Sequence, residues 1–191
     1  NAYDKKDTYL RLRAEINNKN YNNEPVVIVD LDDVIVDFRK CFARWLEENW
    51  TITIDVESEE YYFITDLAKT GLNPEQVFEQ FTQQGGFSWP KIKDGAYRYL
   101  WDLKNKGYWI QYLTARPKDN MQCVYDTYAW ISRHLLPYDG IDFSSEKFRW
   151  CAKSKFYNNI DFAIDDSPKH AQEYAMHGIK CVMPKMPYNK Q

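Results

Sequence analysis

Residues 26–38 read VVIVDLDDVIVDF, an apolar β-branched run that leads directly into four aspartates within eight positions. Val26 to Val29 do not alternate with polar residues, which is the pattern of a strand buried on both faces of a parallel sheet. Asp30 and Asp32 follow where this strand ends, and their spacing directs both side chains to the same side. The stretch therefore predicts a buried strand that delivers negative charge to one end of a sheet.

Other apolar segments alternate with helical patterns along the chain. Residues 108–116, 138–145, 160–166 and 179–184 have the composition of strands, and amphipathic patterns separate them. This alternation is typical of an α/β domain with a doubly wound, mainly parallel sheet. Because such sheets bind ligands at the carboxyl ends of their strands, the residues at those ends are the candidate site.

One region, residues 39–89, interrupts the alternation. It contains two helical patterns and no clear core strand, so we interpret it as a small helical cap inserted after the first strand. The core would then consist of residues 25–38 and 90–191. We expect residues 1–24 to form a short helix and an Asn-rich linker, whose removal would cost little stability.

Composition limits the classes of function. The chain has 191 residues, and no apolar run approaches the ~20 residues of a membrane span, which predicts a soluble, cytoplasmic protein. A net charge of -3 gives no overall attraction to nucleic acid or anionic lipid. No CxxC pair is present, which argues against a zinc ribbon or a redox dithiol and favours reduced thiols at Cys41, Cys123, Cys151 and Cys181.

Carboxylates from two strand ends are expected to meet in one crevice. Asp165 and Asp166 end one apolar segment, as Asp30 and Asp32 end the first strand. Each aspartate could instead serve as a turn former or a helix cap. Four converging carboxylates repel one another unless a cation intervenes, and oxygen ligands favour a hard ion such as Mg²⁺.

Two further strand ends offer groups that bind phosphate. Thr114 ends the strand segment YWIQYLT, and its hydroxyl and the nearby Arg116 could hold phosphate oxygens. Lys147 begins a helical pattern, where both its amino group and the helix N-terminus favour an anion. Lys153 and Lys155 lie late in the same segment and are therefore the weaker candidates.

The order DLD, LT, K and IDD at successive strand ends resembles the haloacid-dehalogenase superfamily of phosphatases, over roughly residues 26–184. The resemblance implies that Asp30 is the nucleophile and Asp32 the general acid/base. It also implies catalytic roles for Thr114 and Lys147, and a metal site formed by Asp30, the backbone carbonyl of Asp32, Asp165 and Asp166. Position 33 is usually Gly in the superfamily's first motif, so Asp33 puts the geometry of this turn in question.

Within the superfamily, DLDDVIVDF (30–38) and GGFSWPKIKDGA (85–96) resemble segments of the 5′(3′)-deoxyribonucleotidases. This resemblance implies a Mg²⁺-dependent hydrolase that acts on nucleoside monophosphates through an aspartyl-phosphate, as a monomer or a homodimer. Aromatic side chains of the cap would then stack on the base, although most aromatics in a small cap form its core. The candidate substrate-binding residues are Phe38, Phe63, Phe87, Trp89 and Arg116.

Two other functions are compatible with the sequence. YDTYAWISRHLL (125–136) and the segment from residue 160 onward also resemble the phosphatase half of phage polynucleotide kinases. That likeness implies action on the 3′-phosphate of a nucleic-acid end, with a basic face contacting the strand through Lys147, Arg149, Lys153 and Lys155. The other alternative is a non-catalytic binding domain that keeps the fold and docks a partner through its N-terminal helix.

Overall fold

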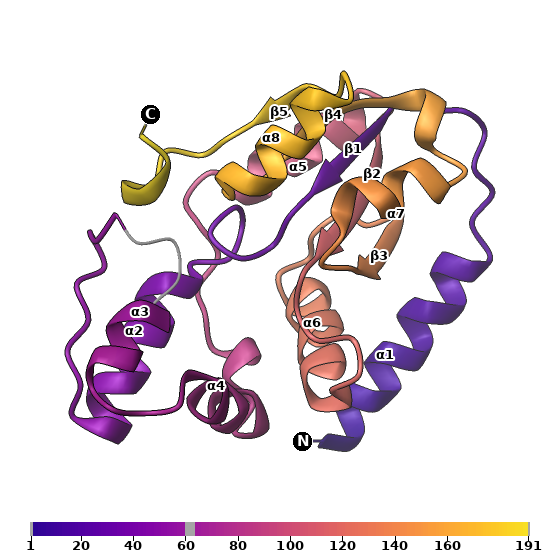
Figure 1. Cartoon of the computed structure of the whole chain (residues 1–191). Helices are drawn as coiled ribbons and strands as arrows, with labels where there is room; N and C mark the ends of the chain where they lie inside the picture. The colour runs from indigo at the N-terminus through magenta and orange to yellow at the C-terminus, as the bar shows by residue number, and fades with distance from the viewer. Residues whose placement is uncertain (1, 60–63, 191) are drawn as a thin grey trace.

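A sheet of five parallel strands forms the centre of the molecule, in the order β3-β2-β1-β4-β5 (Figure 1). The structure is a computed structural model and describes residues 2–59 and 64–190. The strands are β1 (Val26–Val29), β2 (Trp109–Thr114), β3 (Gly140–Phe143), β4 (Ile160–Ile164) and β5 (Cys181–Val182). β1 pairs with β2 on one side and β4 on the other, as its unalternated apolar run predicts. The predicted doubly wound α/β fold is confirmed.

The pairing of β1 with β4 contains one irregularity near its start. The register skips Asp161, which lies between the paired residues Ile160 and Phe162. This is the geometry of a β-bulge, in which one strand carries an extra residue. Beyond it the pairing is regular, and the Asp30 N–H donates to the Ile164 carbonyl at 3.0 Å.

Helices cover both faces of the sheet. Val27 and Val29 of β1 belong to a core shared with α1, α5 and α6, whereas Val26 and Ile28 belong to a core shared with α7 and α8. The alternation of side chains along a strand explains this division. These helices are α1 (Ala2–Asn17), α5 (Ala96–Asn105), α6 (Met121–Arg133), α7 (Lys147–Lys153) and α8 (Pro168–Met176).

A helical region between β1 and α5 has a hydrophobic core of its own, which includes Phe42, Trp45 and Phe81. Its elements are α2 (Phe38–Trp50), α3 (Ile64–Lys69), α4 (Pro74–Gln83) and the 3-10 helix η1 (Gly86–Ser88). In Figure 1, α2, α3 and α4 lie together to one side of the sheet. The described residues of this region contain no strand, in agreement with the expected insertion. We call this region the cap; its boundaries at 38/39 and 89/90 stay a prediction.

The N-terminal helix α1 is more tightly integrated than the sequence led us to expect. It runs along α6 (Figure 1), and Leu12 is completely buried in the core. Lys5 Nζ lies 2.7 Å from Asp126 of α6, and Lys19 Nζ lies 2.9 Å from Asp139. Burial of Leu12 and neutralisation of buried carboxylates both depend on this segment, so we now expect its removal to cost more stability than the sequence suggested.

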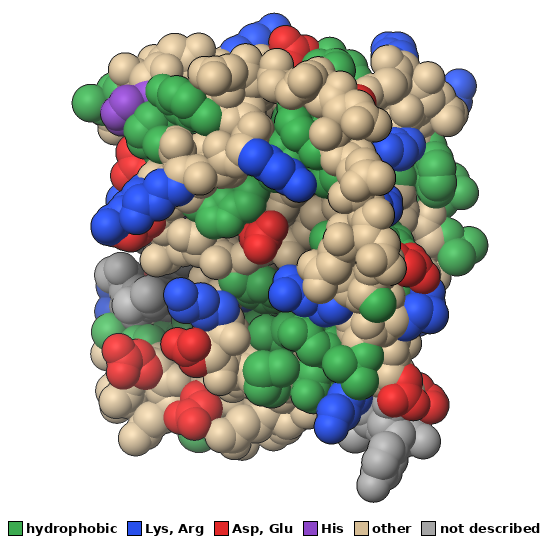
Figure 2. Space-filling model, turned by 90° about the vertical axis from the view of Figure 1, so that its right-hand side faces the viewer, with side chains coloured by type: hydrophobic (Ala, Val, Ile, Leu, Met, Phe, Trp, Pro, Cys, Tyr) green, Lys and Arg blue, Asp and Glu red, His purple; other side chains and the backbone are tan. Residues whose placement is uncertain are grey.

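The surface shows no dominant charge on the face drawn in Figure 2, where basic and acidic side chains are intermixed. Among residues 2–59 and 64–190, no helix has the length and apolar character to cross a bilayer. All four cysteines are free thiols, and Cys123 and Cys151 are buried. This agrees with the absence of a CxxC pair.

Candidate active site

The chain turns sharply after β1, and the turn places Asp33 in the left-handed region with φ 60°. Gly adopts this conformation without strain, and Asp is among the few other residues that tolerate it. The Asp33 carboxylate accepts the Arg39 N–H at 3.0 Å, which ties the turn to the start of α2. Burial raises the pKa of Asp33 to about 7. Asp33 thus keeps the turn and adds an acceptor that Gly would lack.

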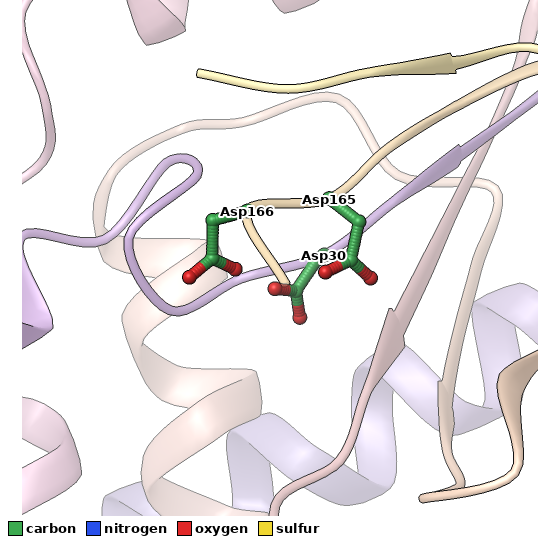
Figure 3. Close-up of side chains that lie close together, drawn as sticks. All are labelled: Asp30, Asp165 and Asp166. Atoms are coloured by element: carbon green, nitrogen blue, oxygen red, sulfur yellow. The ribbon is translucent and has the colours of Figure 1, made fainter. Parts of the chain in front are cut away.

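Three buried carboxylates meet at the ends of two neighbouring strands. Asp30 follows β1, while Asp165 and Asp166 follow β4. One oxygen from each of the three lies within 4.8 Å of the others. Figure 3 shows them gathered between the end of β1 and the loop that leaves β4. The parallel pairing of β1 with β4 brings these strand ends together, as the sequence predicts.

Lys147, the first residue of α7, places its amino group among these carboxylates. Its Nζ atom lies 2.8 Å from Asp30 Oδ1 and 2.7 Å from Asp165 Oδ2, and the residue is only 1% exposed. Although burial lowers the pKa of Lys147, the charges of Asp30 and Asp165 outweigh this effect and raise it. The lysine is therefore a fixed cation at neutral pH.

The three carboxyl groups do not have equivalent surroundings. Burial and then the charge of Asp165 raise the pKa of Asp30, and burial and then the charge of Asp30 raise the pKa of Asp166 well above its usual value. Burial also opposes ionisation of Asp165, but the nearby His170, whose Nδ1 lies 3.4 Å from Asp165 Oδ2, and the charge of Lys147 outweigh it and lower its pKa. Burial and mutual repulsion therefore oppose the simultaneous ionisation of all three carboxyl groups, even with Lys147 beside them.

The cluster fits a divalent cation. Asp166 Oδ1 is buried and has no hydrogen-bond partner among the described residues, which is costly for a carboxylate oxygen. The three donors are all carboxylate oxygens, which hard ions prefer. A cation among Asp30, Asp165 and Asp166 would satisfy the unpaired oxygen and reduce the mutual repulsion. The Asp32 carboxylate lies outside this group.

Asp32 is held instead by Arg116, which follows β2. Arg116 Nη2 and Nε donate to the two carboxylate oxygens at 2.6 Å and 3.0 Å. Arg116 in turn donates to Thr127 Oγ1 of α6 at 3.0 Å and stacks 4.4 Å above the Phe87 ring. The Asp32 side chain stays 27% exposed whereas that of Arg116 is 2% exposed. A buried guanidinium thus orients a carboxylate that faces solvent.

Apart from Asp165, these groups line one cavity of about 280 Å³ between the sheet and the cap. The sheet side contributes Asp30, Asp32, Thr114, Arg116, Lys147, Asp166 and His170. The cap side contributes the rings of Phe38, Phe78 and Phe87 and the side chain of Arg39. The cavity therefore joins a charged end, suited to an anion, to an aromatic wall.

Of the predicted site residues that the structure describes, all but Asp165 and Trp89 line this cavity. Trp89 lies beyond the short helix η1 and lines a different cavity with Trp45 and Lys91. Phe63 lies outside the described residues. Thr114 is where it was expected, buried at the end of β2, and its Oγ1 accepts the Arg116 N–H at 3.2 Å.

Sequence reasoning did not single out three residues of the cavity wall: Arg39, Phe78 and His170. His170 Nδ1 lies 3.4 Å from Asp165 Oδ2, and its position in the first turn of the helix after IDDSP could have indicated it. Arg39 directly follows Phe38, but its burial is not evident from sequence because Arg is rarely buried without partners. Phe78 resembles any core residue of an amphipathic helix.

Residues 24–191 match the model of the family described as "5' nucleotidase, deoxy (Pyrimidine), cytosolic type C protein". The chain belongs to this nucleotidase family. It is 30% identical over 169 residues to a Chlorobaculum tepidum protein named "Putative 5'(3')-deoxyribonucleotidase", a match that covers 82% of this chain and 77% of that protein.

Solved structures support the same fold for this nucleotidase. A haloacid dehalogenase-like hydrolase from Streptococcus pneumoniae matches with a TM-score of 0.58 at 14% identity, over 84% of each chain. A second hydrolase from S. pneumoniae TIGR4 matches with a TM-score of 0.54 at 16% identity, over 86% of this chain and 95% of that chain.

The family places this nucleotidase in the haloacid-dehalogenase superfamily and makes it a phosphoric monoester hydrolase. Phosphatases of this superfamily use a divalent metal, and the Asp30, Asp165 and Asp166 cluster is suited to hold one. The alternative of a non-catalytic binding domain is thereby set aside. Helix α1 precedes the matched residues, so the family model does not include it.

Proposed function

We propose that this nucleotidase hydrolyses deoxynucleoside monophosphates in a Mg²⁺-dependent reaction, through an aspartyl-phosphate formed on Asp30. The observation that carries the proposal is the cavity of about 280 Å³, in which the carboxylates of Asp30 and Asp32 share one small space with three phenylalanine rings. The charged end suits a phosphate and the rings suit a nucleobase. The name of the C. tepidum relative points to the same substrate class.

In the first step, an Asp30 carboxylate oxygen attacks phosphorus and the bond to the leaving oxygen breaks. Asp32 gives a proton to that oxygen, so the nucleoside departs as a neutral alcohol. Lys147, 2.8 Å from Asp30, contributes a positive charge that a phosphate oxygen can share, and the Thr114 hydroxyl is a second donor. Asp30, Asp165 and Asp166 would hold Mg²⁺, which when bound offsets the repulsion between nucleophile and phosphate.

In the second step, Asp32 accepts a proton from water, and the resulting oxygen attacks phosphorus to release inorganic phosphate and restore Asp30. The two bonds from Arg116 hold the Asp32 carboxylate in one orientation for both proton transfers.

The base would contact the aromatic wall. Phe38 and Phe87 are nearly parallel, with ring centroids 5.8 Å apart and an interplanar angle of 14°. Phe87 is also fixed by the stacked guanidinium of Arg116. Arg116 therefore contacts both Asp32, at the charged end of the cavity, and Phe87, in its aromatic wall.

The structure gives less support to action on a nucleic-acid 3′ end. The four basic side chains between positions 147 and 155 do not form one continuous basic surface. Lys147 is buried in the site, and Arg149 pairs with Glu146 at 3.3 Å. Lys155 lies above aromatic rings, 5.6 Å from that of Trp109. A strand-binding surface needs several free cations along one path.

The test is phosphate release from 5′- and 3′-deoxynucleotides, ribonucleotides, a sugar phosphate and a 3′-phosphorylated oligonucleotide, with and without Mg²⁺. We expect Mg²⁺-dependent release concentrated on deoxynucleoside monophosphates, and none from the Asp30→Asn variant. Preference for the oligonucleotide would replace the proposal with end repair. Full activity of Asp30→Asn would refute the assigned nucleophile.

A further inference from the structure

The C-terminal segment returns to the acidic cluster after β5. Figure 1 shows it running from β5 toward the cap side of the molecule. Within the 3-10 helix η3 (Pro187–Asn189), the Tyr188 hydroxyl donates to Asp166 Oδ2. Asn189 Nδ2 donates to the Asp166 carbonyl at 3.1 Å and to the Pro184 carbonyl at 2.8 Å. The segment thus contacts both the backbone and the side chain of Asp166.

The ring of Tyr188 faces the cap. The Arg39 guanidinium lies 5.0 Å from the ring centroid and also donates to the carbonyls of Val56 and Ser58 at 2.8 Å and 2.7 Å. Arg39 itself lines the active-site cavity. Tyr188 therefore touches the acidic cluster with its hydroxyl and a substrate-facing arginine of the cap with its ring.

The Tyr188 hydroxyl gives the two carboxylate oxygens of Asp166 different roles. Because Oδ2 accepts from Tyr188, the carboxylate is fixed with Oδ1, the buried oxygen without a hydrogen-bond partner among the described residues, left for a cation. Hydrogen bonds of this kind orient metal ligands, and their loss commonly weakens metal affinity about 10- to 100-fold.

We propose that Tyr188 is a positioning residue with two functions: its hydroxyl orients Asp166 toward a divalent cation, and its ring holds Arg39 at the substrate cavity. The inference rests on the metal site of the proposed function. The C-terminal segment thereby links cation binding to the cap.

Other bonds hold the segment in place, so the hydroxyl can be removed selectively. Met186 N donates to Asn189 Oδ1 at 2.9 Å, and Lys93 Nζ lies 2.8 Å from the Asp33 carbonyl and 3.5 Å from Met186 Sδ. A Tyr188→Phe variant keeps the ring and these anchors. A Tyr188→Leu variant removes the hydroxyl and the ring together.

The experiment is a Mn²⁺ titration of the substrate-free protein, followed by the electron paramagnetic resonance signal of free Mn²⁺. We expect Tyr188→Phe to bind Mn²⁺ about 10-fold more weakly or worse, with an unchanged circular dichroism spectrum. Tyr97→Phe, at an exposed tyrosine of α5, should bind as the wild type does. In steady-state assays at saturating metal, only Tyr188→Leu should raise KM substantially.

Equal Mn²⁺ affinity of Tyr188→Phe and the wild type would overturn the role of the hydroxyl while leaving the metal site intact. Equal KM values for Tyr188→Phe and Tyr188→Leu would overturn the role of the ring. A wild-type protein that binds no Mn²⁺, with or without phosphate, would overturn the metal site and this inference together.

Discussion

Arg116 donates two parallel hydrogen bonds, of 2.6 Å and 3.0 Å, to the two carboxylate oxygens of Asp32. Lysine cannot reproduce this geometry, because it offers a point charge rather than a planar fork. Arg116→Lys should lower kcat/KM by about 10- to 100-fold, since misplacing a catalytic group by about 1 Å costs up to about 100-fold. Steady-state kinetics on a deoxynucleoside monophosphate check this, with Arg149→Lys at an exposed ion pair as the matched control. Equal kcat/KM for both variants would refute the positioning role.

Lys147 compensates two buried carboxylates, so its removal should destabilise the metal-free protein. Breaking a buried ion pair typically costs about 3–5 kcal/mol, because a charge is left without a partner. Lys147→Met should lose stability in this range in urea unfolding, and Mg²⁺ should restore part of it by binding the uncompensated carboxylates. Lys153→Met, at an exposed position of the same helix, should change little. A loss that is equal in both variants would contradict the prediction.

The contribution of the contact between α1 and α6 to the free energy of unfolding should be measurable by substituting a single side chain. Asp126 is fully buried, and Lys5 is its cationic partner at 2.7 Å. Lys5→Met should therefore cost about 1–3 kcal/mol of unfolding free energy, whereas Arg11→Met, in an exposed pair, should cost at most about 0.5 kcal/mol. Adding Asp126→Asn to Lys5→Met should recover part of the loss. If Lys5→Met costs no more than Arg11→Met, the buried pair contributes nothing.

Asp142 of β3 should reduce stability as the pH rises. Burial raises its pKa above the usual value of 3.8, against the opposing effects of Gln111 and Arg13, so the folded state binds the proton more tightly than the unfolded state. The contribution of Asp142 to the free energy of unfolding is therefore most favourable below that usual value, and it falls as the pH rises through the raised pKa. Asp142→Asn can still accept the 2.8 Å bond from Gln111.

Urea unfolding of the wild type and Asp142→Asn at pH 4 and pH 7 tests this. We expect the variant to be the more stable protein at pH 7, with a difference that shrinks toward pH 4. A wild type that is the more stable at pH 7 would show that the ionised carboxylate is favourable in the fold.

The site residues at the strand ends could be predicted from sequence because each of them directly follows its own strand. Asp30, Thr114 and Asp165 each follow a short apolar run, and parallel strands necessarily bring such positions to one edge. Lys147 could be preferred to Lys153 because a residue at the start of a helix points back to the same edge. These four residues do meet in the structure.

Contacts between distant segments could not be predicted in this way. Nothing in residues 1–24 signals that Lys5 neutralises Asp126, since the two are 121 positions apart. Tyr188 lies in a short segment without periodicity, and its hydroxyl finds Asp166 only because the chain folds back after β5. Phe87 and Trp89 look equivalent in sequence, but the turn at η1 sends them to different cavities.

The bulge at Asp161 sets the alignment of the whole catalytic edge. If Asp161 paired regularly with Val27 instead of bulging out, each later residue of β4 would lie one position further along β1, and Ile164 rather than Asp165 would lie beside Asp30. The carboxylates would then exchange places with an aliphatic side chain, although every residue of the site was still encoded. Length changes in the outer loops leave this alignment untouched, whereas an insertion or deletion between Phe162 and Asp166 would shift it.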